Sequence, residues 1–151
     1  MKIICHRGNQ NGKSTLENYP PYITSALDNG YDAEIDVWYR DNRYFLGHDY
    51  PQFVINEEFL LREGLWIHAK NIDALAKLHY RTNAFFHNID DVVLTSNGYL
   101  WVYPNKPISQ YSNKCVVVLK GDVEYSSEDL NACYGICVDD VRISFLNNGI
   151  D

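Results

Sequence analysis

The stretch Gly30–Asp49, GYDAEIDVWYRDNRYFLGHD, decides the fold and carries the densest set of chemically active side chains. Apolar residues alternate with other types over positions 33–38, and in a β-strand this alternation places Glu34 and Asp36 on one face. Two carboxylates this close raise each other's pKa unless a cation or several hydrogen-bond donors lie between them. The pattern therefore predicts a strand whose two carboxylates face a cation or a group of hydrogen-bond donors.

The chain is predicted to turn back directly after this strand. The polar turn 40–43 is followed by a short apolar segment, 44–46, and then by Gly47, His48 and Asp49. A return of about six residues permits a hairpin, because a parallel crossover needs a dozen or more residues. We therefore expect His48 to lie near Glu34 and Asp36.

The length and net charge of the chain limit the number of domains and the classes of function that we expect. A chain of 151 residues predicts a single domain, residues 1–151, with one hydrophobic core. The formal net charge of -7 argues against nucleic-acid binding, which requires clustered Lys and Arg. The segment 1–5 resembles a strand rather than a secretory signal, and no apolar run is long enough for a membrane span.

The four cysteines indicate a reducing compartment. Cys5, Cys115, Cys133 and Cys137 lie in apolar, strand-like surroundings and not in C-x-x-C pairs. We expect all four to be buried and reduced, which predicts a cytoplasmic protein. The spacing of Cys133 and Cys137 does not suggest a metal clip, because no second pair accompanies it.

Eight strand-like segments recur along the chain, and eight is the strand number of the common barrel. They are residues 2–6, 33–38, 65–70, 84–87, 92–95, 100–103, 115–119 and 135–138. Helices are expected after the capping residues Asn18, Asn56, Asn71 and Ser126. Because other connections are too short for helices, and Asn97-Gly98 signals a hairpin, the prediction is a compact, helix-depleted (β/α)8 TIM-like barrel. An open α/β sheet is the alternative.

In such a barrel the carboxyl ends of the strands share one rim, where active sites lie. The polar residues expected at this rim are His6, Arg7, Glu34, Asp36, His48, Asp49, His68, Lys70, His87, Tyr103, Lys120 and Asp139. Each has an ordinary explanation alone: a histidine at a strand end is common, and the two acids could form a half-exposed strand face. Together they suit phosphodiester cleavage.

The chemistry assigns a task to each kind of side chain. A cation held by Glu34 and Asp36 would bind a phosphate oxygen, and Arg7 and Lys70 would add fixed positive charge. Two imidazoles that titrate near neutrality can remove one proton and supply another. Oxygen ligands favour Mg²⁺ or Ca²⁺.

Several short motifs resemble the glycerophosphodiester phosphodiesterases and the phospholipase-C-like superfamily. They are HRG at 6–8, EN at 17–18, G-x-x-x-E-x-D at 30–36 and HD at 48–49, with weaker matches in I-x-x-K at 67–70, in LWVYPN through Trp101 and Asn105, and in GICVD at 135–139. The resemblance implies a (β/α)8 barrel and metal-dependent hydrolysis of a phosphodiester whose neighbouring hydroxyl attacks phosphorus. It also implies roles: His6 and His48 as the acid/base pair, Arg7 and Lys70 as phosphate ligands, and Glu34 and Asp36 as metal ligands.

The chain departs from this family at one metal position, where His68 replaces a third carboxylate. An imidazole can ligate a metal, so the expected ligands are Glu34, Asp36 and His68, with Mn²⁺ or Zn²⁺ as alternatives to Mg²⁺ or Ca²⁺. Asp122 or Asp139 could compensate for the lost charge. The short loops leave an open or small substrate pocket, for which His87, Trp101, Tyr103 and Asp139 are candidates; Tyr39, Tyr50 and Tyr111 could line a groove or pack at the rim.

The leading prediction is a phosphodiesterase that hydrolyses a small phosphodiester with a divalent metal. Two alternatives stay open: a non-hydrolytic relative that binds a phosphorylated sugar or lipid headgroup, and a sugar-phosphate isomerase that uses Glu34 and His48 as proton carriers. Missing barrel helices would leave apolar strand faces exposed, which suggests a homodimer.

Overall fold

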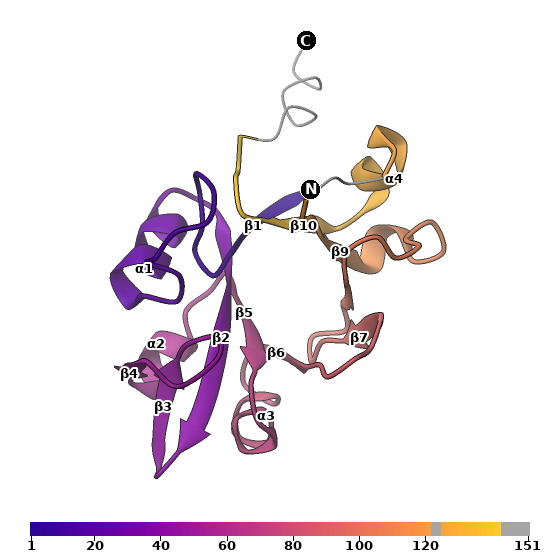
Figure 1. Cartoon of the computed structure of the whole chain (residues 1–151). Helices are drawn as coiled ribbons and strands as arrows, with labels where there is room; N and C mark the ends of the chain where they lie inside the picture. Colours follow the sequence, from indigo (N-terminus) through magenta and orange to yellow (C-terminus); the bar gives the residue numbers. More distant parts are fainter. Residues whose placement is uncertain (122–124, 143–151) are drawn as a thin grey trace.

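The computed structural model describes residues 1–121 and 125–142 (Figure 1). Ten strands form one mixed sheet, and the described residues hold four short α-helices. The strands are β1 (Lys2–His6), β2 (Asp32–Arg40), β3 (Arg43–Leu46), β4 (Phe53–Ile55), β5 (Leu65–Ala69), β6 (Asn83–Phe86), β7 (Val92–Leu94), β8 (Leu100–Val102), β9 (Cys115–Val118) and β10 (Gly135–Val138). The helices are α1 (Pro20–Asp28), α2 (Glu57–Leu60), α3 (Ile72–Leu78) and α4 (Ser127–Ala132), with a 3₁₀ turn at Ser112–Lys114.

The sheet runs in the order β6-β5-β2-β1-β10-β9-β8-β7 and curls around a central axis (Figure 1). Neighbours are parallel from β6 to β8, whereas β7 is antiparallel to β8. β3 and β4 extend the sheet as antiparallel strands beside the second half of β2. At the far side, the backbone N–H of Ser96 donates to the carbonyl of Ala84 over 2.8 Å, which joins the β7–β8 hairpin to β6.

The prediction of a (β/α)8 TIM-like barrel is wrong, because the protein is a curled, mixed half-barrel with few helices. The hairpin at Asn97-Gly98 makes β7 run against β8, and an antiparallel neighbour cannot belong to a ring of βα units. The connections before and after β7, residues 87–91 and 95–99, are also too short to return over the sheet as helices. The individual strands nevertheless lie close to their expected positions, and β4 is an addition.

Three of the four capping predictions are confirmed. The side chains of Asn56, Asn71 and Ser126 each accept from a backbone N–H in the first turn of α2, α3 and α4. The prediction for Asn18 is wrong: α1 begins after Tyr19 with proline in its first turn and without a side-chain cap. The Asn18 side chain is engaged elsewhere, in the site described below.

The interior of the half-barrel explains where the functional side chains point. Trp66, Phe85 and Trp101 pack together inside the curl, with ring centroids 5.9 Å apart for Trp66–Trp101 and 4.6 Å for Phe85–Trp101. Residues two positions later along a strand share its face. His68, His87 and Tyr103 follow these three aromatics by two positions and therefore lie above them on the same inner side.

Two further observations bear on the sequence predictions. All four cysteines are buried and free, as expected. No helix between residues 1 and 142, outside the undescribed segment 122–124, combines the length and the apolar character that crossing a membrane requires.

Candidate functional site

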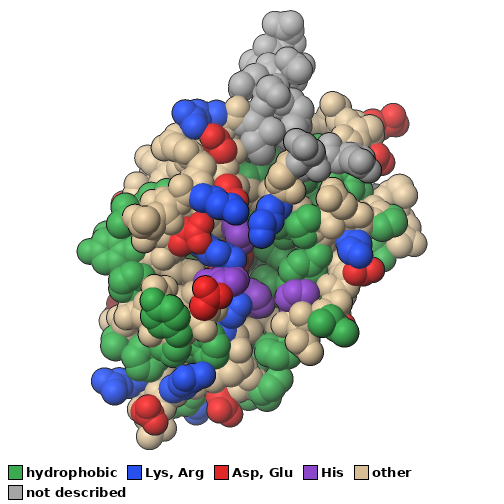
Figure 2. All heavy atoms as spheres, viewed as in Figure 1, with side chains coloured by type: hydrophobic (Ala, Val, Ile, Leu, Met, Phe, Trp, Pro, Cys, Tyr) green, Lys and Arg blue, Asp and Glu red, His purple; other side chains and the backbone are tan. Residues whose placement is uncertain are grey.

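One cavity of about 360 Å³ gathers most of the predicted site residues. It opens where the carboxyl ends of the parallel strands meet, and histidines lie at the centre of this face with basic and acidic side chains around them (Figure 2). The lining residues are His6, Arg7, Glu34, His48, His68, Lys70, His87, Asn88, Trp101, Tyr103, Pro104, Val118 and Lys120. Asp36 lies directly beneath, in contact with Lys70 and His68.

The two carboxylates of β2 are buried, so the interpretation as a half-exposed strand face is wrong. Glu34 is 2% exposed and Asp36 is 1% exposed. Asp36 is surrounded by basic side chains: its Oδ1 lies 3.1 Å from His68 Nδ1 and 3.5 Å from Lys70 Nζ, and its Oδ2 lies 3.2 Å from Arg7 Nε. This carboxylate therefore holds three basic side chains at the base of the cavity.

Asn18, which was predicted to cap the first helix, instead completes the environment of Asp36. Its amide Nδ2 donates to Asp36 Oδ2, and its Oδ1 accepts from the Asp36 backbone N–H, both over 2.9 Å. Asn18 also adopts a φ of 60°, a left-handed conformation in which asparagine is more frequent than most residues. The EN motif at 17–18 was the only signal that could have found it.

Glu17 and Asn9 form a second supporting layer. Glu17 accepts from Arg7 Nη1 over 2.9 Å and from Asn9 Nδ2 over 2.8 Å. The same Asn9 amide also donates to Asp139 over 2.9 Å. This layer fixes the guanidinium of Arg7 and the carboxylate of Asp139, and nothing in the pattern around Asn9 marked that residue as part of a site.

The environments of the two acids drive their pKa values apart. Burial raises the pKa of Glu34, and the negative charge of Asp36 raises it further. Burial would also raise the pKa of Asp36, but the hydrogen bond from His68 and the charges of Lys70 and Arg7 outweigh burial and lower it well below its usual range. The basic groups around Asp36 thus outweigh its burial, whereas those near Glu34 relieve its burial penalty only in part.

Glu34, Asp36 and His68 could hold a metal ion, because one ligand atom from each lies within 4.8 Å of the others. Ligands of one hard cation at bond lengths of roughly 2.0–2.6 Å are separated by about this distance or less. The raised pKa of Glu34 is a second sign of fit, since a cation beside it would relieve the penalty. The set is small, and Asp122, one of the two carboxylates that the sequence offers as compensation, lies outside the described residues.

His6 is paired with Asp139 rather than with a metal ligand. His6 Nδ1 lies 2.8 Å from Asp139 Oδ1, and His6 Nε2 lies 4.0 Å from Glu34 Oε2. Burial would lower the pKa of His6, but the bond to Asp139 and the charge of Glu34 outweigh it and raise the pKa. Asp139 has a lowered pKa despite burial, because His6 and Asn9 donate to it, so it is the acceptor in this pair.

His48 lies at the mouth of the cavity with its own carboxylate. His48 Nδ1 is 2.7 Å from Asp49 Oδ1, and the His48 side chain is 41% exposed. The hairpin of β2 and β3 brings it to the cavity that Glu34 also lines, as the sequence predicted, although the two side chains form no ion pair. Two histidine–carboxylate pairs therefore lie at one cavity, one partly buried and one more exposed.

His87 and Tyr103 form the opposite wall of the cavity. Their rings stack with centroids 3.6 Å apart, and both His87 Nδ1 and Tyr103 Oη are buried without a hydrogen-bond partner among the described residues. Burial lowers the pKa of His87 and raises that of Tyr103, so both stay neutral near pH 7. Trp101 and Tyr103 line the cavity as expected, whereas Tyr39, Tyr50 and Tyr111 do not.

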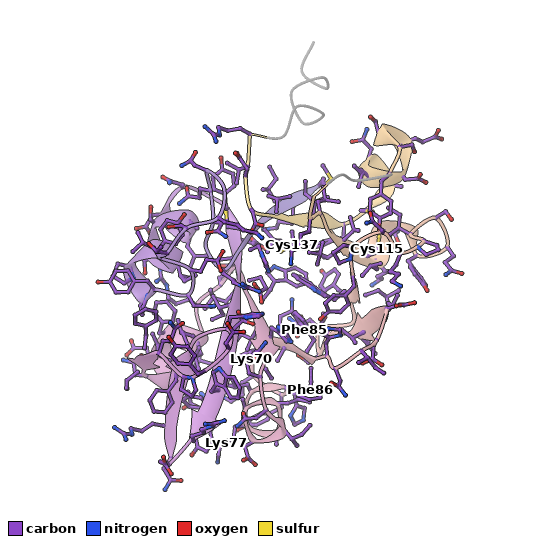
Figure 3. All side chains as sticks on the ribbon, in the orientation of Figure 1. Lys70, Lys77, Phe85, Phe86, Cys115 and Cys137 are labelled. Atoms are coloured by element: carbon purple, nitrogen blue, oxygen red, sulfur yellow. The ribbon has the colours of Figure 1, made fainter. Side chains whose placement is uncertain are left out.

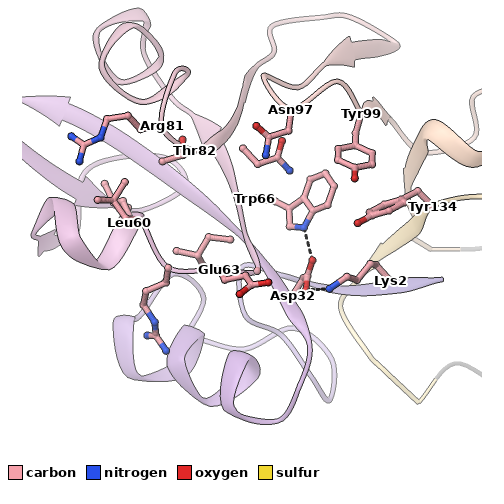
Figure 4. A pocket seen from close by; sticks show the side chains of 15 residues that line it. Lys2, Asp32, Leu60, Glu63, Trp66, Arg81, Thr82, Asn97, Tyr99 and Tyr134 are labelled. Carbon is pink, nitrogen blue, oxygen red and sulfur yellow. Dashed lines mark hydrogen bonds and ion pairs between the residues drawn. The ribbon is translucent and has the colours of Figure 1, made fainter.

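A second cavity, of about 310 Å³, opens at the opposite ends of the strands (Figure 4). Its buried carboxylate, Asp32, accepts from Lys2 Nζ over 3.0 Å and from Trp66 Nε1 over 2.9 Å, as the dashed lines show. Its lining among the described residues includes no histidine. Four of the five histidines of this chain thus line the first cavity.

Comparison with known proteins gives no further assignment: no family model and no curated protein matches this chain. The geometry of the cavity therefore has to carry any functional conclusion.

Proposed function

We propose that this protein hydrolyses a small phosphodiester with the help of a divalent metal ion. The observation that carries the proposal is the convergence on one cavity of two histidine–carboxylate pairs, two buried acids and two basic side chains. The cavity volume of about 360 Å³ lies at the lower end of the range for small-molecule sites. This size favours a small phosphodiester over a long-chain lipid or a polymer.

His6 and His48 supply the proton transfers in this proposal. Because Asp139 accepts from His6 Nδ1, the Nε2 atom of His6 is left to face the cavity, and the raised pKa favours its protonated form. His6 is therefore the general acid, which protonates the leaving oxygen. His48, oriented by Asp49 at the accessible mouth, is the general base for the attacking hydroxyl or water.

Arg7 and Lys70 supply fixed positive charge for the phosphate. Arg7 Nε and Lys70 Nζ lie 3.2 and 3.5 Å from the carboxylate of Asp36, which holds both head groups on the same side of the cavity. Lys70 is labelled in Figure 3. Glu34, Asp36 and His68 would hold the metal. When bound there, a divalent cation would polarise a phosphoryl oxygen and stabilise the charge that develops on it.

The test is hydrolysis of bis(p-nitrophenyl) phosphate and of glycerophosphodiesters by chelator-treated protein, with Mg²⁺, Ca²⁺, Mn²⁺ and Zn²⁺ added back singly. We expect one ion to restore turnover, and His6→Ala and His48→Ala to lower it by at least about 100-fold with folding intact. His79→Ala is the matched control, because His79 is an exposed histidine outside the cavity. Activity without any metal, or near wild-type activity in both site variants, would refute the proposal.

A second candidate is the binding of a phosphorylated sugar or headgroup without hydrolysis. The three basic groups around Asp36 favour it, because they already neutralise one of the supposed metal ligands and leave an anion-binding cluster. Calorimetric binding of glycerol 3-phosphate in the presence of chelator, combined with no turnover under any ion, would support this candidate. That outcome would make His68, which stands in place of a third carboxylate, the first residue to test as the cause of the missing turnover.

A further inference from the structure

A pair of cysteines lies outside the candidate site, where α4 packs beside the start of β9. Cys115 is the first residue of β9 and Cys133 follows α4 directly, and their Sγ atoms are 3.0 Å apart. Both residues are buried, at 0% and 6% exposed. The backbones are held together as well, since the N–H of Tyr134 donates to the carbonyl of Cys115 over 2.9 Å.

We propose that Cys115 and Cys133 are a site of oxidative modification, at which an intramolecular disulfide closes and ties the end of α4 to β9. A disulfide bond is about 2.05 Å long, so the two sulfurs need to approach by only about 1 Å. The backbone hydrogen bond beside them already fixes the register of the two segments. This inference does not depend on the proposed hydrolytic function.

A peroxide is a sufficient oxidant for the reaction. The thiolate of one cysteine attacks hydrogen peroxide, which gives a sulfenic acid and hydroxide, and the hydroxide takes up the proton that the thiol had released and becomes water. The second thiol then displaces water from the sulfenic sulfur as the S–S bond forms. In total the two thiols lose two protons and two electrons, and one peroxide takes them up and becomes two waters. The contact between the two sulfurs lowers the pKa of Cys115 and raises that of Cys133, which favours Cys115 as the thiolate that reacts first.

The two remaining cysteines provide an internal comparison. Cys5 and Cys137 are both buried on neighbouring strands, β1 and β10; Figure 3 labels Cys137 on β10 and Cys115 on the β9 side. Burial raises the pKa of Cys5 to about 12 and also raises that of Cys137. Since the thiolate is the reactive form, these two cysteines should stay reduced under conditions that oxidise the first pair.

The disulfide would act on a strand that reaches the candidate cavity. β9 begins at Cys115 and ends at Val118, which lines the cavity together with Lys120 two residues later. A link at the beginning of β9 would limit local opening of α4 and of this strand. The site thus offers a way for redox conditions to stabilise one wall of the cavity.

The test uses the full chain, reduced, desalted and then exposed to one equivalent of hydrogen peroxide. After alkylation in denaturant, peptide mass spectrometry should show a Cys115–Cys133 link, two alkylated cysteines instead of four, and reversal by dithiothreitol. Cys115→Ser should abolish the link, while Cys5→Ser should retain it. Four alkylated cysteines, or a bond that includes Cys5 or Cys137, would overturn the proposal, and the wild-type peptide map decides this even if a variant fails to fold.

Thermal unfolding tests whether the Cys115–Cys133 disulfide stabilises the protein. Cross-linking residues 18 positions apart should raise the midpoint of the oxidised protein by about 6 to 12 °C over the reduced protein. Cys133→Ser should show no such difference between oxidising and reducing conditions. A fully cross-linked wild-type protein with an unchanged midpoint would overturn the inference that the bond stabilises this wall.

Discussion

Replacing Asn18 by alanine should destabilise the protein more than the same substitution at any other asparagine. Asn18 is 1% exposed and makes both of its hydrogen bonds to Asp36, one from its amide to the carboxylate and one to its carbonyl from the backbone N–H. Alanine would leave a buried N–H without a partner and would remove a donor from a buried charge. Both losses carry a penalty because water cannot replace the missing groups.

The expected magnitude follows from three contributions. The orphaned backbone N–H of Asp36 costs about 1–3 kcal/mol, and the lost hydrogen bond to its carboxylate costs about 1.5–3 kcal/mol. Alanine at the φ of 60° that Asn18 adopts adds about 1 kcal/mol. The free energy of unfolding should therefore fall by about 3.5 to 7 kcal/mol, a large part of the roughly 5–15 kcal/mol typical of a folded domain.

Urea unfolding followed by tryptophan fluorescence measures this difference. Asn18→Gly is the companion variant: it removes the same hydrogen bonds but tolerates the left-handed φ, so it should be about 1 kcal/mol more stable than Asn18→Ala. Asn56→Ala is the control, because Asn56 makes a single capping bond to Phe59 and should cost only about 1 kcal/mol. A loss of about 1 kcal/mol or less for Asn18→Ala would refute the reasoning and show that Asp36 does not depend on Asn18.

Three further predictions concern the site. Glu34→Gln should weaken binding of the activating metal ion by at least about 10-fold in calorimetric titration, while exposed Glu63→Gln should leave it unchanged; equal affinities would make Glu34 structural. Gly47→Ala should lower turnover by about 100-fold, because a Cβ there would overlap the backbone oxygen of Tyr50 and displace His48, whereas Gly98→Ala, with open space around it, should not. Asp139 has a folded-state pKa below its unfolded value, so its stabilising effect is present above about pH 4 and is lost as the pH falls through the folded-state pKa. Acid titration of stability should therefore be shallower in Asp139→Asn than in the wild type, and identical curves would contradict the role of its bonds to His6 and Asn9.

Sequence patterns predicted strand positions well and the closure of the sheet poorly. Alternation and turn signals are local, which is why segments such as 2–6 and 135–138 coincide with β1 and β10. Whether eight strands form a ring of parallel units depends on pairing between distant segments. The Asn97-Gly98 turn was identified as a hairpin, and this local signal, rather than the strand count, determined how that side of the sheet is built.

The same limit applies to the site. The predicted residues were found because strand alternation and strand ends fix where side chains such as Glu34 and His68 point. Their supporting partners could not be found in this way. Asn9 and Asn18 lie in the loop between β1 and α1, where no periodicity applies, and their bonds to Asp139 and Asp36 depend on the folded path of that loop.

Glu34 and Asp36 lie in different charge environments, and we therefore expect their replacement to affect metal-dependent turnover and phosphate binding differently. Asp36 is compensated by three basic side chains, whereas Glu34 accepts one backbone N–H, from Arg7, and lies 3.9 Å or more from the nearest imidazoles. Glu34 is therefore the less compensated of the two acids, and a divalent cation or a proton would neutralise it further. Loss of the Glu34 carboxylate should then remove metal-dependent turnover and spare phosphate binding. Loss of the Asp36 carboxylate should release Lys70 and Arg7 from their positions and impair both activities.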